Sequence, residues 1–172
     1  MKTLFLLAKA KGNVDIPDKW IEKLPGRIGL VGTSQHIHQL PEVRQKLEKK
    51  GKKVVMLKGT HSKNQGQVLG CDSLNLDVST VDAVLFIGTG MFHPKGLLFG
   101  KDKPLFVYDP AAKQFREIKK EEIESLENRR VAGLKKFLSS EKIGVLITTK
   151  PGQTRFLKSL ELKKLYPAKK FF

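Results

Sequence analysis

The chain has 172 residues, of which 40% are hydrophobic, with one cysteine and a net charge of +16. This length and apolar content suit one ordinary domain, or one domain with part of another, and argue against a disordered chain. The single cysteine excludes an intrachain disulfide and, with only four histidines, the common zinc patterns built on CxxC pairs. We therefore expect a soluble protein of a reducing, cytoplasmic compartment.

The positive charge leaves the partner class open. It suits nucleic acid, anionic lipid or an acidic protein, and it equally suits plain solubility. Two stretches concentrate it, with seven basic residues against Glu48 over 44–58 and seven against Glu161 over 150–170. Few aromatic residues interleave them, so stacking on single-stranded nucleic acid is poorly supported. The longest apolar run, Ala83–Gly88, is far shorter than the roughly 20 residues of a membrane helix, which argues against a membrane protein.

Short apolar runs bounded by Gly and Pro predict strands that are buried on both faces. After an opening strand, four such runs follow at regular intervals: Leu4–Ala8, then Arg27–Gly32, Lys53–Leu57, Ala83–Gly88 and Pro104–Tyr108. A helix is predicted over Leu40–Lys50, where Pro41 suits the first turn and Gly51 the C-terminal stop.

The second half of the chain continues the alternation. Gln114–Ile118 alternates like an edge strand, Ile143–Thr149 resembles another buried strand, and 156–165 reads as a helix. A long helix is predicted over Glu121–Ser139. Its inward face is expected to comprise Ile123, Leu126, Leu134, Phe137 and Leu138.

These elements predict a three-layer α/β domain with a parallel four-stranded sheet and helices on both faces. The elements at both ends lack partners in the sequence, so we expect them to be parts of flanking domains. Residues 1–20 are assigned to the last strand of a preceding domain, 21–140 to a central domain that carries Cys71, and 141–172 to the truncated start of a third.

Polar, glycine-rich segments follow three of the strands, at residues 32–38, 58–62 and 88–94, and they contain all four histidines. Ligands of open parallel sheets sit beyond the carboxyl ends of the strands, so this clustering predicts a site there. Gly88-Thr89-Gly90 could cradle phosphate, but a dinucleotide site needs a third glycine where this chain has His93. His36 and His38, two apart on an extended segment, would share a face, although without a further ligand a satisfied or solvent-facing pair is favoured over a metal site.

Cys71 lies in a glycine-flanked loop, Gly66-Gln67-Val68-Leu69-Gly70-Cys71. One interpretation is a small buried thiol. The other is an activated thiolate, either nucleophilic or bound to a metal, because flanking glycines allow backbone amides to approach the sulfur.

Four ordered motifs together resemble the archaeal diphthamide synthase family, over about residues 3–160. They are Gly26–His38, the Cys71 loop 66–71, Phe86–Pro94 with Tyr108-Asp109-Pro110, and Gly144–Arg155. The first three resemble the family's middle domain, and the last resembles the start of its third domain.

The resemblance implies a transferase. Family members have three domains that each supply one cysteine to a 4Fe-4S cluster, which binds S-adenosylmethionine and generates a 3-amino-3-carboxypropyl radical. That group is transferred to a histidine of translation elongation factor 2, the first step of diphthamide formation. By resemblance, Cys71 is the middle-domain cluster ligand. The motif positions expected to line the cofactor or substrate pocket are Gln35, His36, Gly88, Gly90, His93 and, more weakly, Gln153 and Arg155.

The chain departs from the family because two of the three cysteines have no counterpart. Three explanations stay open: a split enzyme completed by other chains, a degenerate paralogue, or an incomplete reading of a longer gene. We expect an enzyme component that works with complementary chains or as a homodimer. The alternative is a basic binding module for elongation factor or RNA that has lost the chemistry.

Overall fold

The computed structural model of the chain describes residues 8–59, 61–69, 76–97, 101–149 and 154–172. The chain forms two compact units, Met1–Ser125 and Leu126–Phe172. The helices and strands of the first unit are α1 (Asp18–Ile21), β1 (Arg27–Gly32), the 3-10 turn η1 (Ile37–Gln39), α2 (Leu40–Lys49), β2 (Lys53–Met56), β3 (Ala83–Ile87), α3 (Phe92–Leu97), β4 (Leu105–Asp109) and β5 (Gln114–Ile118). Helix α4 (Lys120–Ser139) begins in the first unit, and β6 (Lys142–Ile143), α5 (Phe156–Leu165) and β7 (Lys170–Phe171) follow it.

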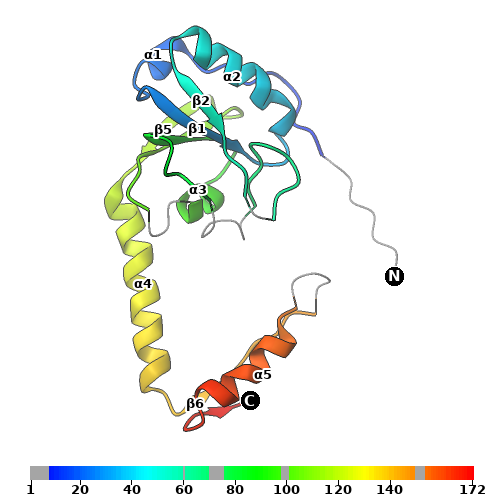
Figure 1. Ribbon diagram of the computed structural model, residues 1–172, viewed down its shortest axis with the longest axis vertical. Helices are drawn as coiled ribbons and strands as arrows, with labels where there is room; N and C mark the ends of the chain where they lie inside the picture. The colour runs from blue at the N-terminus through cyan, green and yellow to red at the C-terminus, as the bar shows by residue number, and fades with distance from the viewer. Residues whose placement is uncertain (1–7, 60, 70–75, 98–100, 150–153) are drawn as a thin grey trace. The chain divides into compact units, whose positions relative to one another are not determined.

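A five-stranded sheet with the order β2-β1-β3-β4-β5 forms the centre of the first unit (Figure 1). Strands β2, β1, β3 and β4 pair in parallel, and β5 pairs antiparallel with β4. The four predicted core strands therefore form as expected, each within a residue or so of its predicted bounds. The predicted edge strand joins the same sheet, so the sheet has five strands where four parallel ones were predicted.

Both faces of the sheet are covered, which makes the domain three-layered as predicted. On β3, Leu85 and Ile87 face one apolar cluster and Val84 and Phe86 face the other. Helices α1 and α2 cover the first face, while α3 and the start of α4 contribute Leu97 and Ile123 to the second (Figure 1). Burial on both faces explains why these strands are continuous apolar runs.

Helix α2 has the sequence signals that its bounds require. Leu40, Val43 and Leu47 form its buried face, and Pro41 lies in the first turn. Gly51 follows the helix with a φ of +79°, a left-handed conformation that glycine adopts readily and that commonly ends helices.

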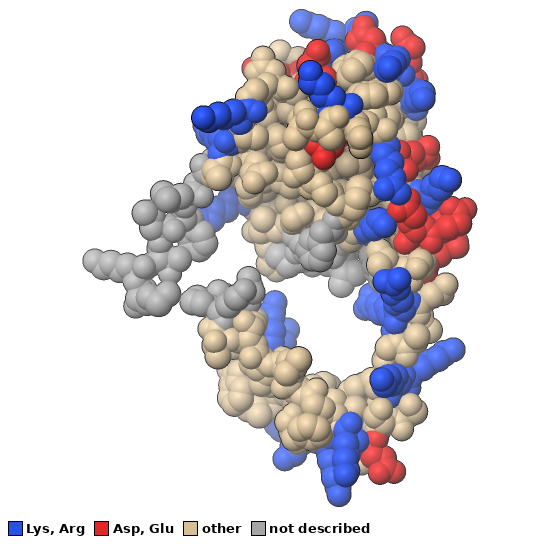
Figure 2. All heavy atoms as spheres, turned by 180° about the vertical axis from the view of Figure 1, so that it is seen from behind, with Lys and Arg blue, Asp and Glu red and all other residues tan. Residues whose placement is uncertain are grey.

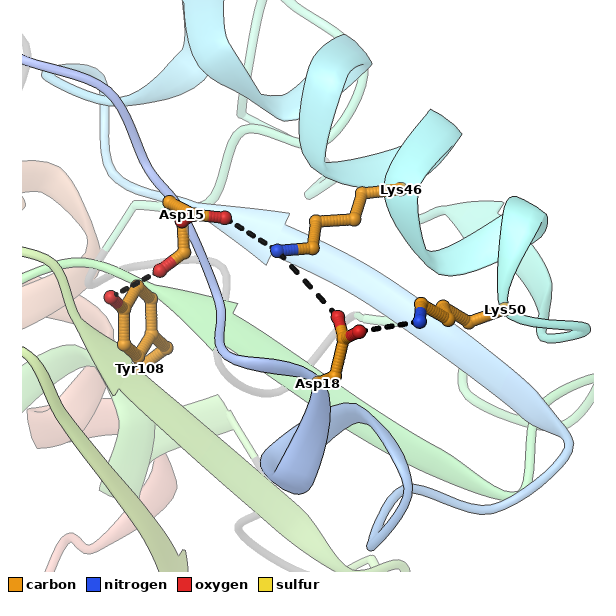
Figure 3. A network of polar contacts seen from close by, with 5 residues as sticks. All are labelled: Asp15, Asp18, Lys46, Lys50 and Tyr108. Carbon is orange, nitrogen blue, oxygen red and sulfur yellow. Dashed lines mark hydrogen bonds and ion pairs between the residues drawn. The ribbon is translucent and has the colours of Figure 1, made fainter.

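Residues 8–17, which we call the strap, precede α1. Polar contacts fix the strap and the start of α1 to the sheet and to α2 (Figure 3). The Tyr108 hydroxyl donates to the Asp15 carbonyl at 2.7 Å, and Lys46 Nζ lies 2.5 Å from Asp15 Oδ1. Lys50 pairs with Asp18, and the hydrogen bond between them lowers the pKa of Asp18 and raises the pKa of Lys50. These contacts hold the strap against the face of the sheet that α2 covers.

The second unit has little buried apolar surface. Residues 144–149 have no regular structure, so the strand predicted over Ile143–Thr149 is wrong beyond its first residue. A buried strand needs neighbours on both faces, and besides β6 itself the described residues of this unit offer only α5, most of α4 and the two-residue strand β7. The predicted inward face of α4 is likewise wrong at Leu134 and Leu138, which are each 54% exposed. Within the described residues, no helix has the length and apolar character needed to cross a membrane.

Glu122 links three elements of the first unit. Its carboxylate lies 2.9 Å from Lys95 Nζ of α3 and 2.5 Å from an Arg116 nitrogen of β5. It also accepts a hydrogen bond from the Lys119 N–H at 3.4 Å, which caps the start of α4. Hydrogen bonding to Lys95, and then to Arg116, lowers the pKa of Glu122 from 4.5 to about 2. Glu122 thus fixes α3, which follows the glycine-rich end of β3.

We predict that Glu122→Gln destabilises this arrangement. Because the pKa of Glu122 is lower in the folded state, its charge stabilises the protein above about pH 4.5, and that contribution is lost as pH falls toward about 2. At neutral pH, losing these pairs should cost about 1 kcal/mol, which lowers the melting temperature by about 2–4 °C for a chain of this size. Melting curves between pH 2 and 7, as measured by circular dichroism, should converge with those of the wild type at acid pH. Glu121→Gln, at an exposed position one residue earlier, serves as the control, and a Glu122→Gln deficit that persists unchanged at pH 2 would contradict the explanation.

Candidate functional site

The strand order reverses between β1 and β3, which marks the carboxyl ends of these two strands as the place for a site. The connection after β1 runs through α2 on one face, and the connection after β3 runs through α3 on the other. At such a switch point the two connections diverge and leave a crevice beyond the strand ends. Two of the predicted segments, 32–38 and 88–94, follow these two strands.

Backbone hydrogen bonds join the end of β1 to the end of β3, and the residue after β3 to β4. The Thr33 N–H donates to the Ile87 carbonyl at 3.2 Å, and the Gly88 N–H donates to the Tyr108 carbonyl at 3.1 Å. A Cβ at position 88 would lie 2.9 Å from the Phe86 ring and 3.0 Å from Thr33 Cγ2, so only glycine fits there. Among the described residues, Thr33 Oγ1 is the one buried side-chain oxygen or nitrogen with no hydrogen-bond partner.

The segment that precedes Cys71 pairs with the end of β1. The Gly32 N–H donates to the Gly66 carbonyl at 2.7 Å, and the Val68 N–H donates to the Gly32 carbonyl at 3.2 Å, as in a parallel ladder. Gly66 also donates to the Leu57 carbonyl at 2.8 Å, just beyond β2. The start of the cysteine loop therefore lies along the carboxyl edge of the sheet, whereas Cys71 itself lies outside the described residues.

Gln67 connects this loop to the segment after β1. Its side chain is buried, and its Nε2 donates to Ser34 Oγ at 2.8 Å. Its Oε1 accepts from the Asn64 backbone N–H at 3.2 Å and from Asn64 Nδ2 at 3.0 Å. Both ends of the amide are thus satisfied, which fixes the two motifs against each other.

His36 and His38 do not form a pair. Residues 37–39 form η1 instead of an extended segment, so His36 is buried and His38 is exposed. His36 Nδ1 lies 2.9 Å from Gln39 Oε1, and Gln39 Nε2 donates to the Gly12 carbonyl. The shared face that the sequence predicted for the two histidines is therefore wrong, because a turn places residues two apart on different sides.

The other residues that the sequence predicted to line the pocket lie in different surroundings. Gln35 has an exposed side chain, and its carbonyl accepts from the Ala10 N–H at 2.9 Å. Gly90 is exposed with a φ of +74°, and His93 is half-buried in α3. Arg155 is exposed at the start of α5, in the second unit. Gln153 lies outside the described residues.

The described residues include no group of three or more His, Cys, Asp or Glu side chains that could hold a metal ion. An iron-sulfur cluster is held chiefly by thiolates, and this chain has one cysteine. Its donor set therefore fits a single cluster ligand and not a complete set of ligands.

Sequence reasoning did not assign roles to Thr33, Ser34, Gln39 or Gln67. The Gln67 and Ser34 contact joins residues 33 apart, which a single sequence does not reveal. The contact of His36 with Gln39 has a local signal, since residues three apart meet across a helical turn.

The strand order and the polar carboxyl edge define an α/β protein with a candidate ligand site at a switch point. A family model described as a putative diphthamide synthesis protein matches residues 1–171. The chain belongs to this family, which confirms the resemblance drawn from the motifs.

Individual proteins that are similar to the chain have names consistent with this family. The chain is 37% identical over 148 residues to 2-(3-amino-3-carboxypropyl)histidine synthase from Pyrococcus horikoshii, covering 84% of this chain and 42% of the relative. It is 27% identical over 143 residues to subunit 1 of the Schizosaccharomyces pombe synthase, covering 78% and 33% respectively. Crystal structures of Dph2 from P. horikoshii, one of them with a 4Fe-4S cluster, match with a TM-score of 0.75 and 33% identity, over 88% of this chain and 44% of theirs. The chain spans less than half the length of these relatives.

We predict that Gly66→Ala disrupts the start of the cysteine loop. An added Cβ would lie 2.5 Å from Met56 Cε and 2.7 Å from Leu40 Cδ1, and the φ of +76° disfavours any side chain. Overpacking and backbone strain together should cost about 2–4 kcal/mol in the free energy of unfolding, as measured by urea denaturation.

Gly133→Ala is the matched control, because an added Cβ there meets no heavy atom within 4 Å. In the helix interior, alanine should stabilise by about 0.5–1 kcal/mol. Equal urea midpoints for the Gly66→Ala variant and the wild type would show that the segment is not held as described.

Proposed function

We propose that this chain is a component of a diphthamide synthase in which Cys71 is one of three thiolate ligands of a 4Fe-4S cluster. The observation that carries the proposal is the backbone pairing of 66–68 with Gly32, which fixes the start of the cysteine loop to the carboxyl edge of the sheet. Cys71 follows Val68 by three residues, and three residues span at most about 11 Å. The names of the relatives and the cluster in a Dph2 neighbour support the same assignment.

On this proposal a bound cluster would supply one electron for cleaving S-adenosylmethionine into 5′-methylthioadenosine and the 3-amino-3-carboxypropyl group. That group would replace a ring proton on a histidine of elongation factor 2, and the electron would return to the cluster. The chain's own residues bind and orient the cofactor. Gln35 and His36 follow the end of β1, and Gly88, Gly90 and His93 follow the end of the neighbouring strand β3. The unpartnered Thr33 Oγ1 at this point supports a site built for a ligand.

Arg155 and Gln153 are assigned by motif to the same cofactor. Arg155 lines a pocket of about 490 Å³ within the second unit, together with Thr148, Lys158 and three apolar residues of 145–147. A guanidinium in such a pocket suits the cofactor carboxylate, which it can bind through two parallel hydrogen bonds.

Partner chains complete the cluster on this proposal. The second unit exposes large apolar side chains that a stable protein surface normally covers. They include Leu146, Ile147, Phe156, Leu157, Leu160, Leu165 and Phe172, which are 40–102% exposed. We infer that complementary synthase chains, or a second copy, cover this surface, and that residues 1–20, 21–140 and 141–172 belong to three domains of the complete assembly.

Anaerobic reconstitution with iron and sulfide tests the cluster assignment. Wild-type chain, mixed with chains that supply the other two cysteines, should develop the absorption and electron paramagnetic resonance signals of a 4Fe-4S cluster. Cys71→Ser should lose most of the bound iron, because a hydroxyl is a poor ligand for iron in these clusters. Ser73→Ala, which leaves the thiol in place, should retain it. A cluster that forms equally well with Cys71→Ser in every combination would reject the assignment.

A basic binding module is the second candidate, and the charge of the second unit favours it. That unit has twelve basic and three acidic residues, and Figure 2 shows their side chains as mostly blue on the face drawn. In the described part of the chain, no ion pair involves Arg155, Lys158, Lys163, Lys164 or Lys170, all of which are exposed. By contrast, Arg44, Lys46 and Lys50 of the other basic stretch are paired with carboxylates.

Charge reversal separates the two basic stretches. If the second unit binds RNA, affinity should fall steeply with salt, and the slope should decrease by about 0.7 for each cation that no longer neutralises a single-strand phosphate. Lys158→Glu/Lys163→Glu should weaken binding about tenfold or more, whereas the control Lys49→Glu/Lys53→Glu should change it far less. Fluorescence anisotropy with RNA and with purified elongation factor 2 would decide between the partners, and salt-independent or undetectable binding to both would exclude this function.

A further inference from the structure

His36 is a buried histidine with a partner for only one of its two ring nitrogens. The residue is 5% exposed, and Nδ1 lies 2.9 Å from Gln39 Oε1. Among the described residues, no hydrogen bond involves Nε2. In this part of the chain, the fully buried side-chain polar atoms without a partner include Thr33 Oγ1 and do not include Nε2. The second nitrogen therefore has no hydrogen-bond partner among the described residues.

The orientation of the Gln39 amide follows from its second contact. Its nitrogen donates to the Gly12 carbonyl, which can only accept. The amide oxygen consequently faces His36, and this oxygen can also only accept. Nδ1 of a neutral His36 must then carry the proton, because a proton on Nε2 would leave two lone pairs facing each other.

The strap holds Gly12 in place. Two residues before Gly12, the Ala10 N–H donates to the Gln35 carbonyl at 2.9 Å. Three residues after it, Asp15 pairs with Lys46 and accepts from the Tyr108 hydroxyl through its carbonyl. The acceptor that orients Gln39 is thus anchored on both sides, so the tautomer of His36 depends on contacts well away from its ring.

We propose that Gln39 and Gly12 hold neutral His36 as its Nδ1–H tautomer, so that Nε2 accepts a hydrogen bond from an N–H donor of a bound ligand. A lone pair attracts an ammonium or amide N–H and repels a carboxylate. Gln39 is a positioning residue that acts through His36. Resting on the proposed function, the donor is the ammonium of the amino-acid part of S-adenosylmethionine, whose carboxylate must then bind elsewhere.

Nitrogen-15 NMR of histidine-labelled full-length chain measures the tautomer directly. At alkaline pH, the neutral wild-type His36 should be the Nδ1–H form by about tenfold or more over the other. The exposed His38 serves as an internal reference in the same spectrum, and single His→Gln variants assign the signals.

Two variants separate positioning from a purely structural role. Gln39→Ala removes the acceptor, so the His36 tautomers should approach the ratio seen for His38. Gln39→Glu keeps an oxygen acceptor and should restore the Nδ1–H form. Gln45→Ala, at an exposed position of α2, is the matched control and should leave the His36 tautomers unchanged.

The ligand is tested with S-adenosylhomocysteine, which retains the ammonium, and with 5′-methylthioadenosine, which lacks the amino-acid part. Only the first should shift the His36 Nε2 resonance, and Gln39→Ala should weaken its binding about tenfold.

A dominant Nε2–H form in the wild type, or unchanged tautomers in Gln39→Ala, overturns the inference while leaving the proposed function standing. A locked tautomer with no Nε2 shift on adding S-adenosylhomocysteine overturns the ligand assignment. Loss of the Cys71-dependent cluster signal is a separate result, and it bears on the proposed function alone.

Discussion

Strand β1 is the constraint on which the arrangement of the first unit depends, because it is hydrogen-bonded on both sides. It pairs in parallel with β2 on one side and β3 on the other, and the strand order reverses at its junction with β3. Both neighbouring strands therefore end at the same edge as β1, and the chain must leave that edge toward opposite faces. The segment 66–68 then pairs with the end of β1, which brings the start of the Cys71 loop to the same edge of the sheet. Three segments that are distant in sequence meet because one strand is central.

Buried amides set the details at that edge. Gln67 satisfies its donor on Ser34 and its acceptor on Asn64, while Gln39 does the same between Gly12 and His36. A buried amide without one of these partners would incur a penalty of about 1–3 kcal/mol. Each amide thus joins a pair of loops in a single arrangement. This rigidity suits a site that must present particular atoms to a ligand, since loops without such contacts adopt several conformations.

Much of the first unit was predictable from local patterns. Apolar runs on both sides of polar, glycine-rich segments identified β1, β2, β3 and β4, and the signals at Pro41 and Gly51 set the bounds of α2. The same reasoning failed at Ile143–Thr149, because an apolar run becomes a buried strand only if other elements cover it, and local sequence does not specify those elements. It also could not find Gln39 or Gln67 as site residues, since their partners Gly12 and Ser34 are 27 and 33 positions away. The pattern located the polar edge of the sheet where the candidate site lies, and tertiary contacts decided how its side chains are paired.

The basic residues of the chain have two different roles. In the stretch that includes α2, Lys46 and Lys50 hold the strap through Asp15 and Asp18, so part of that charge stabilises the fold. The described cations of α5 have no such partners and lie next to exposed apolar side chains such as Leu157 and Leu160. A surface that combines unpaired cations with uncovered apolar groups is typical of a surface that binds a partner, because solubility alone would not require the apolar groups. The same residues therefore support either complementary synthase chains or an acidic partner, and the two proposals differ in what covers the apolar groups.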